Sequence, residues 1–274
     1  MSNEIQTIIT AEPDTQLTYL KKIWKYRSLI SVFAKRDLKV KYAQTALGLG
    51  WTIAQPLTGL FIFTFFFSYV LHWEADGLPY ALYILTGLLG WNFFSYIVFQ
   101  GMGSVQESAN VIKKIYFPKA VLPLSKVLVA LVELSVTFLL LIPLLIWYEQ
   151  PLSWRIIFIP IILLFNTLMG LAVVFITAAL SYKKRDLTHL VPLLRYFGIW
   201  VTPVFFAKNI LPQNLQFIWY LNPMAAVVEG WRWCLFSNWN FDILFLPALL
   251  GSLVLFWLGF YLFNLVENKF SDFA

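Results

Sequence analysis

Residues 127–148 read VLVALVELSVTFLLLIPLLIWY, an apolar run that is interrupted by a single charged residue, Glu133. A helix that crosses the roughly 30 Å hydrocarbon core of a bilayer needs about 20 such residues. The run therefore predicts a membrane-spanning helix. Five other runs have the same character, and the six predicted spans cover about residues 52–72, 78–106, 120–148, 156–181, 187–207 and 243–266.

The composition of the 274 residues supports this interpretation, because 60% are hydrophobic and only 12% are charged. An ordinary soluble domain carries about 25% charged residues. The low charge density excludes a soluble enzyme, a secreted disulfide scaffold and a disordered chain. We expect an all-α integral membrane protein with one transmembrane domain over residues 52–266, preceded by a cytoplasmic segment (1–51) and followed by a short tail (267–274).

Residues 209–240 lie between the fifth and the last predicted spans and contain several helix-breaking and polar residues. Pro212, Asn214, Asn222 and Pro223 argue against a lipid-exposed crossing, because unpaired backbone groups are costly in hydrocarbon. We expect short re-entrant or gate helices here. The charge pattern alone also permits a seven-span topology in which this segment crosses the membrane.

The basic residues predict the orientation in the membrane. Of the 20 Lys and Arg residues, all except Arg155, Lys208 and Arg232 fall on one side of a six-span topology. Such an excess is typical of the cytoplasmic side. We expect a multi-pass protein of the bacterial inner membrane with both termini in the cytoplasm. The same bias accounts for the net charge of +6 without a nucleic-acid partner.

The segment before the first span predicts an amphipathic helix in the cytoplasmic interface, because apolar and basic residues alternate along it. Its basic residues either fix the topology or contact an anionic substrate, since clustered cations bind phosphate groups. The candidate contacts are Lys35, Arg36, Lys39 and Lys41.

Catalytic patterns are missing from the sequence. It has no Gly-x-x-x-x-Gly-Lys-Ser/Thr loop for binding nucleotide phosphates and no His-Glu-x-x-His zinc motif. We therefore expect no catalytic residue, no metal site and no cofactor on this chain. Ion coupling needs ionisable groups within the membrane, and only Glu133 and Arg195 are candidates. If the protein transports a substrate, energy is expected to come from a partner.

Two loops on the predicted cytoplasmic side could meet that partner. Residues 107–118 read ESANVIKKIYFP and predict a short amphipathic helix that could sit in a groove of another protein. Residues 181–187, SYKKRDL, form the second loop. Both could also be ordinary polar connectors. The candidate coupling residues are Glu107, Val111, Ile112, Lys113, Lys114, Tyr116, Arg185 and Asp186.

Aromatic residues recur along several predicted spans and could line a path for sugars, because aromatic faces pack against the C–H groups of sugar rings. The alternative is that they face lipid or form interfacial belts. The candidate conduit residues are Phe61, Phe65, Tyr69, Trp91, Tyr96, Phe99, Tyr196 and Trp200.

Several motifs resemble a known family. Residues 35–57, KRDLKVKYAQTALGLGWTIAQPL, resemble the entry signature of ABC-2 type permeases that export O-antigen, capsule or teichoic acid. Further similarities follow in family order, and they are Tyr-Phe-Pro-Lys at 116–119, Leu-Pro at 122–123, Arg-Asp-Leu at 185–187, Thr-Pro-Val at 202–204 and Asn-Pro at 222–223. Thr45, where the family often has Ser, and the Phe205–Phe206 pair, where a Tyr is usual, depart from the pattern.

The resemblance implies a homodimer that assembles with two copies of a separate ATPase subunit, which would hold ATP and Mg²⁺. It implies that residues 107–118 form the coupling helix and that the substrate is a glycan on a polyprenyl pyrophosphate. We therefore expect the non-enzymatic permease subunit of an ATP-driven polysaccharide exporter. The alternatives are an ABC-2 exporter of a lipid or drug, and an integral membrane glycosyl- or acyltransferase.

Overall fold

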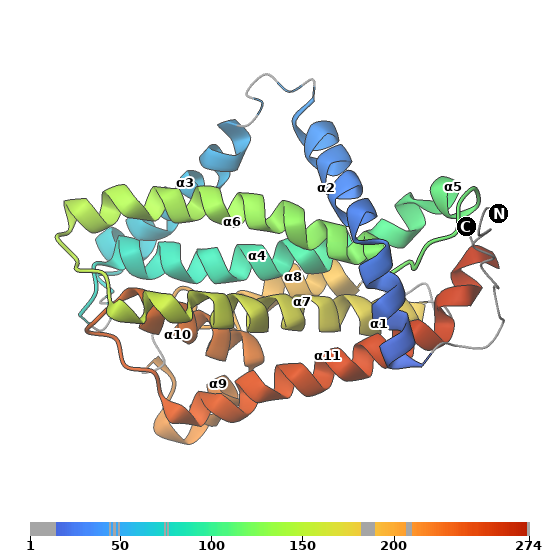
Figure 1. The fold of residues 1–274 in the computed structure, drawn as a ribbon. Helices are drawn as coiled ribbons and strands as arrows, with labels where there is room; N and C mark the ends of the chain where they lie inside the picture. Colours follow the sequence, from blue (N-terminus) through green and yellow to red (C-terminus); the bar gives the residue numbers. More distant parts are fainter. Residues whose placement is uncertain are drawn as a thin grey trace, which may run out of the picture.

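The computed structural model describes residues 15–43, 45, 48, 50–73, 75, 77–181, 190–206 and 210–272. Within these residues the chain is a helical bundle (Figure 1). The elements are α1 (Gln16–Lys25), α2 (Arg27–Tyr42), α3 (Gly50–Phe63), the π-helix η1 (Thr64–Val70), α4 (Tyr80–Glu107), α5 (Ala109–Ile112), α6 (Val121–Trp147), η2 (Trp154–Phe158), α7 (Ile159–Ser181), α8 (Leu190–Gly198), η5 (Gln213–Leu215), α9 (Phe217–Leu221), α10 (Pro223–Leu235), η6 (Ile243–Phe245), α11 (Leu246–Val266) and η7 (Glu267–Asp272).

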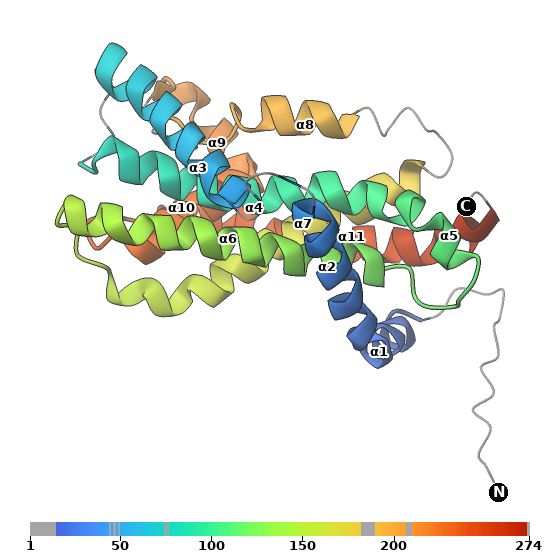
Figure 2. The same ribbon diagram turned by 90° about the horizontal axis from the view of Figure 1, so that it is seen from above.

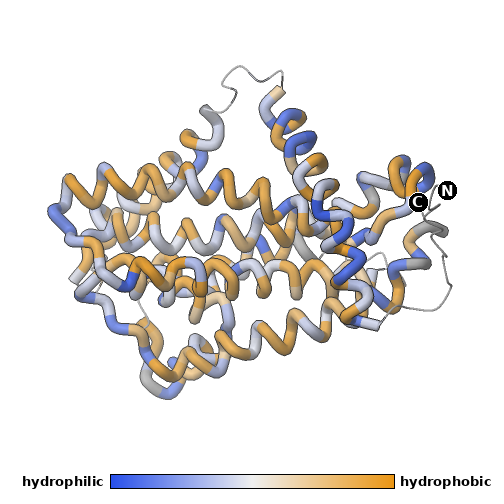
Figure 3. Tube along the Cα trace, viewed as in Figure 1, coloured by the Kyte–Doolittle hydropathy of each residue, from blue (hydrophilic) through white to orange (hydrophobic). Residues whose placement is uncertain are grey.

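The centre of the bundle is α4, which is buried along most of its length and packs against α6, α7 and α10. Helix α11 packs along α7 on the far side (Figures 1 and 2). Apolar residues run the length of these helices, whereas hydrophilic residues concentrate on α1 and α2 at one end (Figure 3). The first span, α3 with η1, and helix α8 lie outside this centre (Figure 2).

Five helices of the described chain are long and apolar enough to cross a membrane, which confirms the all-helical membrane class. They correspond to five of the six predicted spans. Their bounds are Gly50–Val70, Tyr80–Val105, Val121–Trp147, Trp154–Ser181 and Ile243–Val266.

The predicted span over residues 187–207 differs from the structure. Its described part contains α8, of 9 residues, followed by turns through Phe206. A helix of that length rises only about 14 Å, so among the described residues the hydrocarbon core would be crossed by α8 together with the turns that follow it. Pro203 has no N–H to continue the helix. Side chains, rather than helical N–H groups, bind backbone carbonyl oxygens of this segment. The Tyr80 hydroxyl donates to the Phe205 oxygen (2.6 Å), and the Asn222 amide donates to the Val201 oxygen (2.9 Å).

Short helices occupy the segment where gate helices were expected, and α10 is the longest of them. Asn222 caps α10, because its Oδ1 accepts a hydrogen bond from the backbone N–H of Met224 at 2.9 Å, and Pro223 is the first helical residue. Both are favoured helix starts. The apolar and small residues that follow bury nearly all of α10 against α4 and α7.

The first and last described helices lie at the same end of the bundle as α5 (Figure 1). Tyr19 of α1 accepts a hydrogen bond from the backbone N–H of Ala120 (3.4 Å), and Glu267 of η7 accepts one from that of Lys119 (2.8 Å). Burial, and next the Glu267 carboxylate, raise the pKa of Tyr19 well above its usual value. These contacts hold residues 119–120, which follow α5, between α1 and η7.

Candidate functional site

The predicted coupling segment protrudes from the end of α4 as a short basic loop. Its helix, α5, has only 4 residues, so the helix expected over residues 107–118 is shorter than predicted. Val111 and Ile112 pack against a buried apolar cluster, whereas Lys113, Lys114 and Tyr116 are exposed. A hollow of about 200 Å³ lies along residues 112–119. The segment therefore has an apolar side against the bundle and an exposed basic side, and more than half of it is non-helical.

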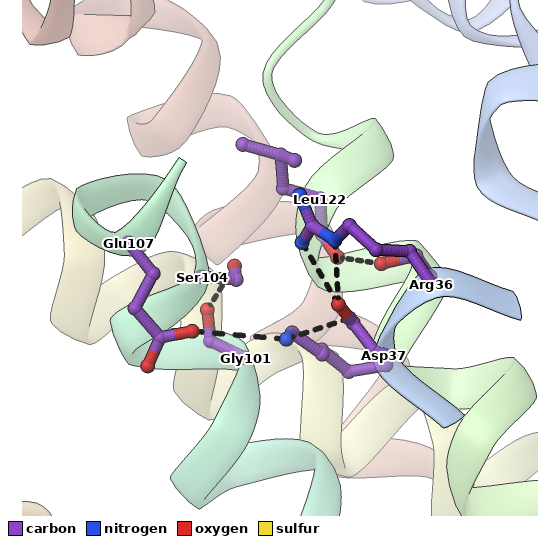
Figure 4. A network of polar contacts seen from close by, with 8 residues as sticks. Arg36, Asp37, Gly101, Ser104, Glu107 and Leu122 are labelled. Atoms are coloured by element: carbon purple, nitrogen blue, oxygen red, sulfur yellow. Dashed lines mark hydrogen bonds and ion pairs between the residues drawn. The ribbon is translucent and has the colours of Figure 1, made fainter. Parts of the chain in front are cut away.

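A chain of charged side chains joins α2, α6 and the end of α4 (Figure 4). Arg36 donates two hydrogen bonds to Asp37, at 3.0 and 2.8 Å. The other carboxylate oxygen of Asp37 lies 2.8 Å from Lys126 Nζ, which also lies 3.8 Å from a carboxylate oxygen of Glu107. The Lys126 side chain is only 6% exposed. The chain of contacts therefore connects the basic helix α2 to the residue at which the coupling segment begins.

We expect Asp37 and Lys126 to be energetically coupled, with an interaction energy of about 1–3 kcal/mol in a double-mutant cycle of Asp37→Asn and Lys126→Met. The reason is that the ammonium group is nearly buried, and each single change removes the 2.8 Å contact and leaves the remaining charge with only its second partner, Arg36 or Glu107. The measurement is thermal unfolding of the purified protein in detergent. The exposed pair of Arg27 and Trp24, whose guanidinium carbon and ring centroid lie 5.2 Å apart, is the control. Additive effects of the two changes would contradict the coupling.

The predicted phosphate-contacting residues have different environments on α2. Lys35 and Lys39 are exposed at the surface, whereas Arg36 is bound to Asp37. Lys41 is also exposed, but its ammonium group forms an ion pair with Glu133 of α6, a contact that the sequence did not predict. Arg185 and Asp186, the candidates in the second loop, lie outside the described residues.

The predicted conduit residues fall into three groups. Phe61, Phe65 and Tyr69 form an exposed row on α3 and η1, with ring centroids 6.4 and 5.6 Å apart. Tyr96 and Phe99 of α4 line a partly open hollow of about 530 Å³. The others lie elsewhere, and they are Trp91, which is buried at 4% exposure, Tyr196, which is exposed, and Trp200, which packs on Phe205 with centroids 4.9 Å apart. A single chain does not bring these side chains together into one track.

The opposite end of the bundle holds a buried ion pair that no sequence pattern predicts. Arg232 is fully buried and donates to Glu229 at 2.6 Å, and Trp239 donates to the second oxygen of the same carboxylate at 2.8 Å. The guanidinium group lies 3.5 Å from the ring centroid of Tyr83 and donates to the Val204 carbonyl oxygen at 3.2 Å. The pair thus fixes α10 to the start of α4 and to the turn after α8.

Comparison with known proteins identifies the family of this bundle. Residues 28–236 match the family described as ABC-2 type transporter. The chain belongs to that family. The match starts near the beginning of α2 and ends just after α10, so it includes the coupling segment, the charged chain of contacts and the buried Arg232 pair.

Curated members of the ABC-2 family are similar to this chain over most of its length. The O-antigen export system permease protein RfbA of Klebsiella pneumoniae is 30% identical over 247 residues, which cover 89% of this chain and 94% of RfbA. RfbA of Myxococcus xanthus is 26% identical, over 92% of this chain and 98% of its own. The polysialic acid transport protein KpsM of Escherichia coli is 21% identical, over 71% and 76%.

Proposed function

We propose that this chain is the permease subunit of an ATP-driven exporter that moves lipid-linked polysaccharide across the bacterial inner membrane. The observation that carries the proposal is the near full-length similarity to permeases named for O-antigen export. The cargo is an O-antigen, a capsule or a teichoic acid chain on polyprenyl pyrophosphate. The chain itself is not an enzyme, and ATP and Mg²⁺ bind to the partner.

The proposed assembly contains two copies of this chain and two ATPase subunits. The exposed basic face of the coupling segment, together with Arg185 and Asp186, docks into the ATPase. The exposed row on α3 and η1 supports a second copy as its neighbour, because few residues of the first span are covered within one chain. Both termini are cytoplasmic, and α8, with the turns that follow it, completes a six-span topology in which α9 and α10 are gate helices.

The substrate enters at α2, where Lys35, Arg36, Lys39 and Lys41 meet the pyrophosphate at the cytoplasmic leaflet. It then passes as an extended chain along the aromatic residues of the two copies. Neutral sugars need no charged relay, which agrees with the small number of ionisable residues in the spans.

The decisive experiment compares proteoliposomes that contain this chain alone with proteoliposomes that also contain its ATPase partner. We expect ATP hydrolysis and movement of lipid-linked glycan only when both subunits are present. A partner with an inactivated phosphate-binding loop is the control. Glycan transport by the chain alone, or along an ion gradient without ATP, would contradict the proposal.

Replacing Phe65, Tyr69 and Trp200 together with alanine is expected to slow glycan export severalfold and to leave the unfolding temperature nearly unchanged. All three side chains are at least 45% exposed in one chain, and only Trp200 packs on a core side chain, Phe205, so their removal is expected to disturb the core little. The control triple replaces Trp147, Tyr148 and Trp154, which are also exposed but lie in α6, the loop after it and η2. Normal export by the Phe65, Tyr69 and Trp200 variant would remove these residues from the conduit.

A further inference from the structure

A polar hollow of about 530 Å³ lies between α2, α3, α4, α6 and α8. Glu133, which borders it, is about 10 Å further along α6 than Lys126, so the hollow reaches beyond the headgroup boundary toward the membrane interior. Amide and hydroxyl side chains line the hollow beside its charged groups, and they include Gln55, Asn92, Ser95 and Gln100. Ionisable groups at this depth are costly and indicate a functional site.

The two cations of the hollow lie against aromatic rings of α4. Lys41 Nζ forms the ion pair with Glu133 and lies 4.8 Å from the ring centroid of Tyr96. The guanidinium carbon of Arg195 lies 4.9 Å from the ring centroid of Phe99. Since Tyr96 and Phe99 are about one turn apart on α4, both cations meet the same helix face. Among the described lining residues, two cations therefore face one carboxylate.

We propose that this hollow binds the phosphate group of an anionic ligand through Lys41 and Arg195, and that Glu133 holds Lys41 until the phosphate displaces it. A guanidinium and an ammonium group are the cations that proteins use for phosphate, the former through paired hydrogen bonds. The surrounding amides and hydroxyls suit a sugar attached to the phosphate. The site is separate from the exposed Lys35 and Lys39, which meet the ligand first at the surface.

Glu133 determines when this site is available. Its carboxylate occupies the position beside Lys41 that a phosphate oxygen would take, so the empty hollow has no unpaired ammonium group at membrane depth. Binding therefore adds the negative charge of the phosphate to a hollow lined by two cations and one carboxylate, and the displaced Glu133 carboxylate stays in that lining. The proposal rests on the proposed function in one respect, since a lipid-linked glycan would supply the phosphate, but a free phosphate has the same chemistry.

The test measures dissociation constants of the permease–ATPase complex in phosphatidylcholine nanodiscs without ATP. One probe is inorganic pyrophosphate in solution, and the other is dioleoyl phosphatidic acid added to the nanodisc lipid. Arg195→Gln is expected to weaken binding roughly tenfold, because a hydrogen bond to a charged group is lost. Glu133→Gln is expected to strengthen binding by a similar factor, because it frees Lys41. Lys25→Gln, which removes one exposed charge from α1, is expected to change nothing.

Stronger binding in Glu133→Gln separates displacement from a merely structural ion pair, whose loss would weaken binding or leave it unchanged. Either of those results overturns the proposal, as does an equal loss in Lys25→Gln or failure of the wild-type complex to bind either probe. Lys41→Arg keeps the charge and is expected to bind as well as the wild type, which tests the site if Glu133→Gln does not fold. Binding of phosphatidic acid alone assigns a lipid ligand, and binding of pyrophosphate alone assigns a soluble one.

This experiment is independent of export. If glycan export persists in cells that lack the chain, the proposed function fails while the binding results stand. If export requires the chain but Glu133→Gln binds no more tightly, the binding proposal fails while the proposed function stands.

Discussion

Arg232→Ala is expected to lower the free energy of unfolding by about 3–5 kcal/mol, because it leaves the Glu229 carboxylate buried without its counter-ion. The wild-type pair is enclosed: Arg232 is fully buried and the Glu229 side chain is 7% exposed. The loss also frees the Val204 carbonyl oxygen and uncovers the Tyr83 ring. The measurement is thermal or denaturant unfolding in detergent.

Two further variants show whether the effect comes from an unpaired charge. The double variant Glu229→Gln/Arg232→Met removes both charges and is expected to be more stable than Arg232→Ala, because replacing a whole buried pair is often nearly neutral. The surface control is Arg27→Ala, in which an exposed guanidinium group over Trp24 is lost. It is expected to change stability by no more than about 0.5 kcal/mol. Equal losses in Arg232→Ala and the double variant would show that packing, not charge, dominates.

Reversing the charge of Lys113 and Lys114 to glutamate is expected to lower ATP-driven export at least about tenfold, because like charges that face each other across an interface cost several kcal/mol. Both lysines are exposed on the coupling segment, whereas Val111 and Ile112 anchor the segment to the bundle. The variant should therefore fold normally and fail to bind the ATPase. Co-purification of the two subunits and glycan export in cells are the two measurements.

The matched control reverses Lys21 and Lys25 of α1, which are exposed at the same end of the bundle but lie outside the coupling segment. It makes the same change in net charge and in the charge bias that orients the protein in the membrane. Normal export is expected from this control. Unchanged ATPase binding by the variant with Lys113 and Lys114 reversed would refute the docking role.

Local patterns in the sequence predicted much of the fold. Five spans follow from the length of apolar runs, and the start of α10 follows from Asn222 and Pro223, because span length and helix capping depend on neighbouring residues. The turns after α8 could not be predicted from neighbouring residues. Residues 199–206 remain apolar enough for a span, but side chains from α4 and from the start of α10 bind their carbonyl oxygens.

The charged contacts could not be predicted because they join distant parts of the chain. Lys41 and Glu133 are 92 residues apart, and Asp37 and Lys126 are 89 residues apart. The sequence indicated the basic character of α2 and singled out Glu133 as the one charge in its apolar run, but only the packing of α2 against α6 pairs them. Arg232 was interpreted as a residue of the outer loops for the same reason, since its burial depends on three segments meeting at one point.

The weak attachment of the first span to its own subunit has a consequence for biosynthesis. Helix α3 and η1 form the first of the spans to leave the ribosome, yet few of their residues are covered by the rest of the chain. Such a helix stays in contact with lipid after the other spans have packed, and its exposed aromatic row is covered only when another protein surface arrives. Newly made chains that find no partner subunit should therefore be recognised by membrane proteases, and their cellular half-life should report on assembly.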